Sequence, residues 1–184
     1  MNYFATPISS DASFENYQKT VVKGIEQGEI KPFENLTGSS DVLFKRFQAK
    51  GKRVHLWGIK RDKLSRWQKA KNNDILFFYR KKTIVSWCRI LDKFEDTDIA
   101  TILWGAFENA HYSRFTWPLI ILLDPPTPCN ISFVKFNKIL GYEENYSLRS
   151  FFKLNDKFNQ FIENNYGGVD QFASTESQIE KVVS

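Results

Sequence analysis

The sequence has few of the residues on which disulfide scaffolds, metal centres and membrane spans depend. Its two cysteines, Cys88 and Cys129, lie far apart and form no CxxC pair, which argues against a disulfide framework and fits a reducing cytoplasm. The cysteines and the two histidines lack any recognised ligand spacing, so we expect no metal and no cofactor. The longest apolar run, residues 119–123, is much shorter than the roughly 18–20 residues of a membrane span. Because the N-terminus also lacks the pattern of a secretory signal, we expect a cytoplasmic protein without membrane partners.

The chain also lacks the motifs of common catalytic sites. It contains no GxxxxGK[ST] phosphate loop, no GxSxG nucleophile elbow and no cluster of acids with a lysine that is typical of Mg²⁺ nucleases. Residues 120–126 (IILLDPP) are similar to the Asp-Pro-Pro-aromatic motif of amino-methyltransferases, but Thr127 takes the aromatic place and no glycine-rich cofactor loop is present. We interpret Pro125 and Pro126 as the end of a central strand. The sequence therefore favours a binding domain over an enzyme.

Positive charge is concentrated in one part of the chain. Residues 45–82 hold 14 of the 26 basic residues and two acids, a net charge of +12 over 38 residues, whereas the remainder has a net charge of −7. Basic side chains interleaved with aromatic rings suit a polyanion that also presents flat bases, which describes nucleic acid. The alternative is a solvated helix face beside a core strand. The aromatic residues of this stretch include Trp57, Trp67, Phe77, Phe78 and Tyr79.

The candidates for contact with the nucleic-acid backbone all lie in this basic stretch. Lysine and arginine side chains neutralise phosphates regardless of base sequence, and they supply the salt-dependent part of the affinity. The candidate backbone contacts are Lys60, Arg61, Lys63, Arg66, Lys69, Lys71, Arg80, Lys81 and Lys82.

The hydrophobic pattern predicts alternating helices and short strands. Apolar residues from Phe14 to Ile25 follow a helical period, with Asp11 or Ser13 as the N-cap. A loop at 35–41 and a short helix at 42–49 are expected to follow. The pattern then predicts strands at 53–59, 75–80, 83–91, 117–123 and 145–153, and helices at 62–70, 95–104, 131–140 and 155–166.

Several short motifs occur in an order that is typical of a known group of domains. A strand ends in Trp57-Gly58-Ile59, residues 73–79 (NDILFFY) lead into a hairpin, Trp117-Pro118 opens an apolar strand, and residues 136–142 (FNKILGY) end a helix. This order resembles the PUA-like group of small β-barrels, which includes the EVE and YTH domains. It is most similar to the EVE-like N-terminal DNA-binding domains of McrB-type modification-dependent restriction systems. The resemblance covers residues 52–153, and Asn73 departs from the glycine usual before the aspartate.

The resemblance implies an α+β fold with a curved mixed sheet or open β-barrel of about five or six strands, flanked by helices. We expect three parts: an N-terminal helical extension at 1–50, the EVE/YTH-like nucleic-acid-binding domain at 51–168, and a flexible tail or linker at 169–184. The tail is polar and follows Gly167-Gly168, so it is expected to lead to further domains or subunits of a restriction motor or nuclease.

The resemblance also implies non-catalytic recognition of a modified base. In such domains a base with a small modification is held in an aromatic pocket, after flipping when the target is a DNA duplex. The expected partner is DNA carrying a methylated or hydroxymethylated base, with methyladenine, methylcytosine and hydroxymethylcytosine all open. The alternative is an RNA-binding PUA/YTH-like module.

The candidates for the base pocket come from the ends of the expected strands and from the loops near them. Trp57 ends a strand before a glycine, and Tyr79 ends another beside Arg80. Trp67 is placed where YTH domains have a cage tryptophan, although it could equally pack its helix onto the barrel. Trp117, at the start of a buried strand, is expected in the core. The candidate pocket residues are Trp57, Gly58, Ile59, Trp67, Tyr79, Trp87, Trp104, Tyr112 and Phe115.

Overall fold

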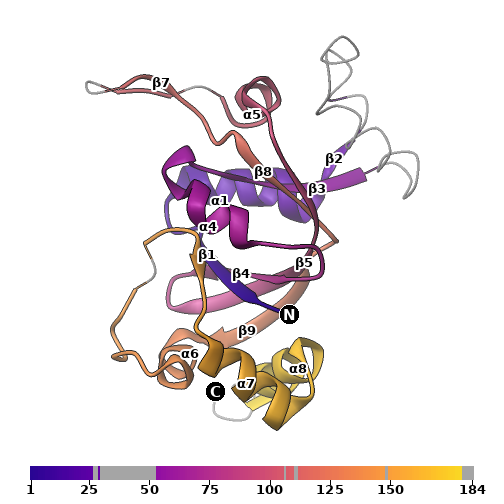
Figure 1. The fold of residues 1–184 in the computed structure, drawn as a ribbon, viewed down its shortest axis with the longest axis vertical. Helices are drawn as coiled ribbons and strands as arrows, with labels where there is room; N and C mark the ends of the chain where they lie inside the picture. The colour runs from indigo at the N-terminus through magenta and orange to yellow at the C-terminus, as the bar shows by residue number, and fades with distance from the viewer. Residues whose placement is uncertain (27–28, 30–52, 106, 110–111, 148, 180–184) are drawn as a thin grey trace.

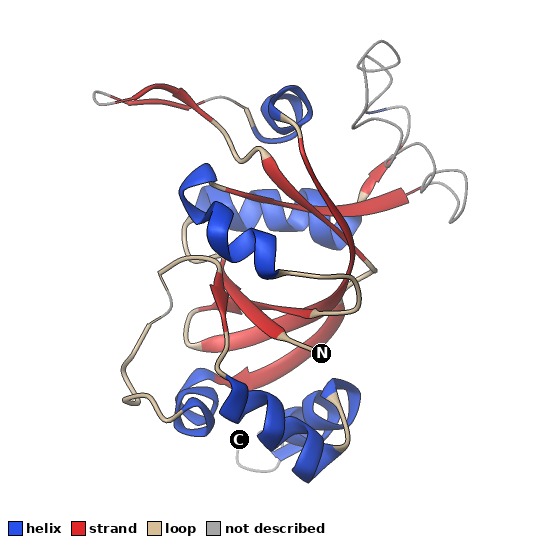
Figure 2. Ribbon diagram, in the orientation of Figure 1, coloured by secondary structure: helices blue, strands red, loops and turns tan. Residues whose placement is uncertain are grey.

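The computed structural model describes residues 1–26, 29, 53–105, 107–109, 112–147 and 149–179. They form an α+β fold in which one curved, unclosed sheet of eight strands is flanked by helices (Figures 1 and 2). The expected fold class is thereby confirmed, with more strands than expected. The strands of this sheet are β1 (Tyr3–Pro7), β2 (Ile25–Glu26), β3 (Arg53–Ile59), β4 (Ile75–Arg80), β5 (Thr83–Glu95), β8 (Leu119–Leu123), β9 (Thr127–Ser132) and β10 (Phe152–Lys153).

The helices lie on both sides of the sheet (Figure 2). A two-stranded ribbon, formed by β6 (Phe107–Asn109) and β7 (Tyr112–Phe115), projects from the body (Figure 1). None of the helices in the described ranges is long and apolar enough to cross a membrane. The α-helices are α1 (Asp11–Tyr17), α4 (Leu64–Lys69), α5 (Thr97–Trp104), α6 (Phe133–Leu140), α7 (Asp156–Tyr166) and α8 (Val169–Ile179).

The long strand β5 gives the sheet its curvature. Its first half pairs with β4 on one edge and β9 on the other, and its second half pairs with β8. Strand β8 in turn pairs with β3. All of these pairs are antiparallel, whereas β1 runs parallel to β4, so the sheet is mixed as expected. A register shift within β5, between Ile90 and Asp92, coincides with the change of direction.

Strands β8 and β9 form one interrupted ladder along β5, and the interruption is the IILLDPP segment. Asp124 bridges the gap, because its side-chain Oδ1 accepts from the Arg89 N–H at 2.6 Å and its own N–H donates to the Arg89 carbonyl at 3.0 Å. Pro125 and Pro126 have no N–H to donate and end β8, as the sequence predicted. The motif therefore has a structural explanation in this fold.

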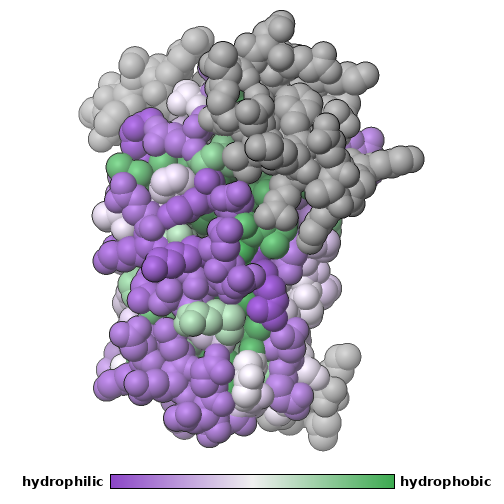
Figure 3. Space-filling model, turned by 45° about the vertical axis from the view of Figure 1, so that its right-hand side comes forward, coloured by the Kyte–Doolittle hydropathy of each residue, from purple (hydrophilic) through white to green (hydrophobic). Residues whose placement is uncertain are grey.

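Strand β4 is buried on both faces, which explains its unbroken apolar sequence. Ile75 and Phe77 belong to a core covered by α6, α7 and α8, whereas Leu76 and Phe78 belong to the core inside the curl. A third core lies between α5 and the outer face of β3 and β8. On the face shown in Figure 3, hydrophilic residues cover most of the described surface, and apolar residues appear between them in narrow patches.

The N-terminal residues are part of this sheet rather than a helical extension. Strand β1 lies between β10 and β4, and Tyr3 and Phe4 are fully buried. The predicted helix from Phe14 to Ile25 is instead α1 followed by a π-helix, Gln18–Lys23, and the N-cap is Ser10. The loop at 35–41 and the helix at 42–49 lie outside the described residues.

The C-terminal segment also differs from the expected flexible tail. Residues from Val169 to Ile179 form α8, and Phe172 is fully buried among the rings of Phe77, Phe158 and Tyr166. The segment was predicted as a tail because its composition is mostly polar, and only one face of α8 is apolar.

Candidate nucleic-acid interface

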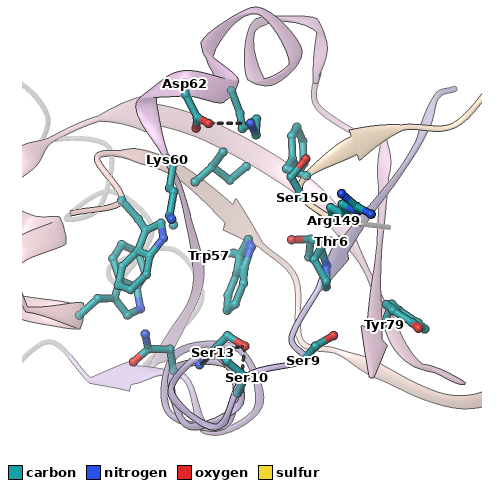
Figure 4. Close-up of a pocket in the computed structure, with 18 of the residues that line it drawn as sticks. Thr6, Ser9, Ser10, Ser13, Trp57, Lys60, Asp62, Tyr79, Arg149 and Ser150 are labelled. Atoms are coloured by element: carbon teal, nitrogen blue, oxygen red, sulfur yellow. Dashed lines mark hydrogen bonds and ion pairs between the residues drawn. The ribbon is translucent and has the colours of Figure 1, made fainter. Parts of the chain in front are cut away.

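A cavity of about 790 Å³ opens where the curl of the sheet brings two distant strands together. Strands β1 and β3 both end at this cavity, although β4, β5 and β8 separate them in the sheet. The first turns of α1 and the segment around Arg149 complete the wall (Figure 4). The polar lining residues are Thr6, Ser9, Ser10, Ser13, Asn16, Lys60, Asp62, Lys63, Ser147, Arg149 and Ser150, and the others are Pro7, Trp57, Gly58, Ile59, Tyr79, Trp104, Trp117 and Phe151.

The N-terminal cap of α1 fixes the serines on the wall. Strand β1 ends at Pro7, and the next N–H, from Ile8, donates to the Tyr79 carbonyl at 2.8 Å. The hydroxyl of Ser10 then accepts from the Ser13 N–H at 3.1 Å, and the Ser13 hydroxyl donates to the Ser10 carbonyl at 2.8 Å. This reciprocal cap satisfies helix-terminal groups and holds both hydroxyls at the cavity.

The end of β3 forms the apolar part of the wall. Trp57 is 7% exposed, and its ring meets Phe78 edge to face, with centroids 5.4 Å apart. Gly58 follows, and Trp104 and Trp117 pack directly on its backbone. The Trp104 Nε1 donates to the Thr20 hydroxyl at 3.4 Å, which ties the end of α5 to the π-helix. Trp117 therefore lines the cavity, and β8 begins two residues after it.

Five of the predicted pocket residues meet at this cavity: Trp57, Gly58, Ile59, Tyr79 and Trp104. Their side chains are mostly covered, since Ile59 is 3%, Tyr79 8% and Trp104 6% exposed. The Tyr79 ring packs on Phe133 with centroids 4.0 Å apart, on the helix-covered side of the sheet. The aromatic residues thus form a floor, and the accessible rim is mainly polar.

Trp67 and Trp87 lie away from the cavity, in the core. Trp67 packs on the inner core, and its Nε1 lies 3.4 Å from the Ile120 carbonyl while the Lys93 Nζ lies 4.7 Å from its ring centre. Trp87 is 3% exposed in the core under α6 and α7. Strand β7 contains Tyr112 and Phe115, whose side chains lie outside the described part of the structure.

The predicted cations differ in their surroundings. Lys60 and Lys63 line the cavity, and Lys63 pairs with Asp62 at 2.6 Å. Arg66 lies behind the wall instead: its Nη1 donates at 3.1 Å to both the Ser150 hydroxyl and the Phe151 carbonyl. It thereby holds the segment that presents Arg149. Arg66 is therefore placed to position the wall of the cavity.

Other predicted cations lie away from the cavity wall. Arg61 forms an ion pair with Glu95, and the Arg80 guanidinium lies 3.5 Å from the ring centre of Phe14 on α1. Lys69 and Lys71 are exposed near α4. Lys81 and Lys82 form the exposed turn between β4 and β5, and both have positive φ angles, 46° and 64°.

Sequence reasoning missed several residues of the wall, namely Thr6, the serines and Arg149. Thr6 lies in the segment that was expected to be a helical extension, and Arg149 lies outside the basic stretch, so neither had a local signal. Only the pairing of β1 with β4 places Thr6 near the end of β3.

Two cysteine thiols and one tyrosine near the sheet are protonated at neutral pH. Burial raises the pKa of the Cys129 thiol to about 12 and that of the Cys88 thiol well above its usual value. Burial also raises the pKa of Tyr17, although a 2.7 Å hydrogen bond with Ser86 opposes the shift. Neither thiol therefore has the low pKa of a cysteine nucleophile. Among the described residues, no group of three His, Cys, Asp or Glu side chains could hold a metal ion.

Comparison with known proteins identifies the fold. No protein-family model matches the sequence, and no curated protein matches it. The structure is similar to the N-terminal domain of Thermococcus gammatolerans McrB bound to m5C DNA, with a TM-score of 0.61 and 16% sequence identity, over 89% of this chain and 96% of that chain. The chain therefore has the fold of that domain, and the likeness inferred from the order of motifs is confirmed at the level of the fold.

Proposed function

We propose that this protein recognises a modified base in DNA by accepting the flipped-out base in the cavity between β1 and β3, without catalysis, and that it targets a modification-dependent restriction complex. The main support for this proposal is the cavity itself, which has Trp57 in its floor and cationic side chains on its rim. The shared fold supports the proposal, because the similar McrB domain is bound to methylated DNA.

The size and the lining of the cavity suit a nucleotide. Its volume of about 790 Å³ is within the usual range for small-ligand sites and exceeds the space that a base alone needs. The apolar floor of Trp57, Ile59 and Trp104 gives a small apolar modification a surface to pack on, worth about 0.8 kcal/mol for each buried carbon. Such a gain separates modified from plain bases only when the rest of the base is also held.

The rim suits the sugar-phosphate backbone on either side of the flipped base. Arg149 is exposed on the wall, and Lys60 lies on the opposite side of the cavity in the view of Figure 4. Cations at these positions neutralise the phosphates next to the extruded nucleotide and offset part of the cost of flipping, which is a few kcal/mol. The lysines of the β4–β5 turn add affinity that does not depend on base identity.

The test is binding to matched oligonucleotides. The purified protein is titrated with one duplex carrying a central 5-methylcytosine, 5-hydroxymethylcytosine, N6-methyladenine or no modification, and with the corresponding RNA. We expect a preference for one modified DNA duplex, and a rise in fluorescence of a 2-aminopurine placed opposite or beside the target base when that base leaves the stack. Equal affinity for all DNA duplexes would overturn the proposal, and a preference for modified RNA would favour the RNA-binding alternative.

A further inference from the structure

Two polar atoms in the cavity have no partner among the described residues. They are the hydroxyl of Thr6, at the end of β1, and the indole N–H of Trp57, at the end of β3. Both side chains are more than nine-tenths buried, with Thr6 4% and Trp57 7% exposed. Figure 4 shows the two side chains facing each other across the cavity.

Trp104 and Trp67 differ from Trp57, because their indole N–H groups have partners within the protein. The indole N–H of Trp104 reaches the Thr20 hydroxyl, and that of Trp67 lies 3.4 Å from a backbone carbonyl. Buried polar groups in folded proteins are nearly always paired, because leaving one unpaired costs free energy. The Thr6 hydroxyl and the Trp57 N–H are not sealed in the core but accessible from the cavity, so a ligand that enters it can pair with both.

The exposure of Trp57 indicates how it meets that ligand. Since 7% of the residue is accessible and Phe78 packs on it, the indole offers little ring face for stacking. Its N–H remains available as a directed donor. A hydroxyl group both donates and accepts hydrogen bonds. If Trp57 donates to an acceptor atom of the ligand, the Thr6 hydroxyl can accept from a ligand N–H next to that atom.

We infer that Thr6 and Trp57 read the Watson–Crick edge of the base, and that the accepted bases are those whose edge keeps an acceptor next to an N–H. This inference rests on the proposed function and specifies its ligand class. The edge is available only in an unpaired base, so the pair selects a flipped base. The modification must leave this edge intact, as in a C5-substituted pyrimidine or a singly methylated amino group. A base methylated on the edge nitrogen is rejected because it leaves a buried partner unpaired.

The test compares Thr6→Val with Thr6→Ser, using the modified duplex that the wild-type protein binds most tightly. Valine keeps the shape and suits a strand, so Thr6→Val should melt close to the wild-type temperature. We expect its affinity for the modified duplex to fall about 5- to 100-fold, and the ratio of modified to plain affinity to fall with it. Thr6→Ser keeps the hydroxyl and should retain most of the preference.

A second arm keeps the protein unchanged and alters the base edge. A duplex with N3-methylcytosine or N1-methyladenine at the same position should bind no better than plain DNA. If the wild-type protein prefers the modified duplex but Thr6→Val keeps that preference in full, or the edge-blocked base binds equally well, the edge-reading inference is wrong and base recognition stands. If the wild-type protein binds modified and plain duplexes equally, the proposed function and this inference are both wrong.

Discussion

The backbone of Gly58 lies directly against the ring of Trp104. A Cβ atom on Gly58 would be 2.6 Å from Cζ3 of Trp104 and 2.7 Å from Cβ of Trp117. This contact joins the end of β3 to the end of α5 and to the start of β8 beside the cavity. The glycine of the Trp57-Gly58 pair is therefore needed for packing, because it lets Trp104 and Trp117 approach the strand closely.

Replacing Gly58 with alanine should disturb this contact. Because Cβ of Trp117 cannot rotate away, the strand or the tryptophans must shift, and overpacking of this kind costs about 1–3 kcal/mol. We expect a lower free energy of unfolding in urea and weaker binding of the modified duplex, since Trp57 and Ile59 move with the strand. An unchanged unfolding curve would show that the wall adjusts freely.

Two basic residues on α4 should respond differently to substitution. Arg66→Ala removes the hydrogen bonds to Ser150 and Phe151, so the ratio of modified to plain DNA affinity should fall several-fold. Lys69→Ala should weaken binding to both duplexes alike, because Lys69 is exposed on the same helix. Arg66→Lys keeps the charge but not the paired geometry. If Arg66→Lys has the wild-type ratio of modified to plain DNA affinity, Arg66 acts as a phosphate contact, as the sequence predicted.

Replacing the two lysines of the β4–β5 turn should raise the stability of the protein and lower its affinity for DNA. Lys81 and Lys82 both have positive φ angles, which lysine adopts at a cost and which Asn-Gly adopts readily. The double variant Lys81→Asn with Lys82→Gly should gain up to about 1 kcal/mol of stability. Its affinity for plain and modified duplex should fall together, and the slope of log affinity against log salt should decrease by up to about 2. Lys157→Asn, on α7 away from the cavity, is the control that should leave the slope unchanged; an unchanged slope in the double variant would remove the turn from the interface.

Helix α8 should be required for stability. Phe172→Ala removes a fully buried ring and should lower the free energy of unfolding by about 3–5 kcal/mol. Ser174→Ala, at an exposed position of the same helix, should change it by less than about 0.5 kcal/mol. Equal stability of the two variants would return the segment after Gly168 to its expected role as a dispensable tail.

Much of the fold could be predicted because its signals are local. Residues 75–80 are an unbroken apolar and aromatic run between a turn and two lysines, and they form β4 with the predicted bounds. The order of the Trp57-Gly58, Trp117-Pro118 and FNKILGY motifs led to the right fold, since each motif marks the end of an element. Local signals failed at both chain ends, where β1 and α8 are ordered by tertiary contacts rather than by their own periodicity.

The sequence by itself determined the charge of the basic stretch, the strand and helix content of the centre, and the candidate Trp57. Only the tertiary structure decided which side chains share a cavity. Thr6 and Arg149 join Trp57 there because β1 pairs in parallel with β4 while β3 pairs with β8, and the curl of the sheet closes the distance. The same arrangement of strands buries Trp87 and packs Trp67 against the inner core. Periodicity shows that a residue faces one side of a strand, but the pairing of distant strands decides whether that side is core or cavity.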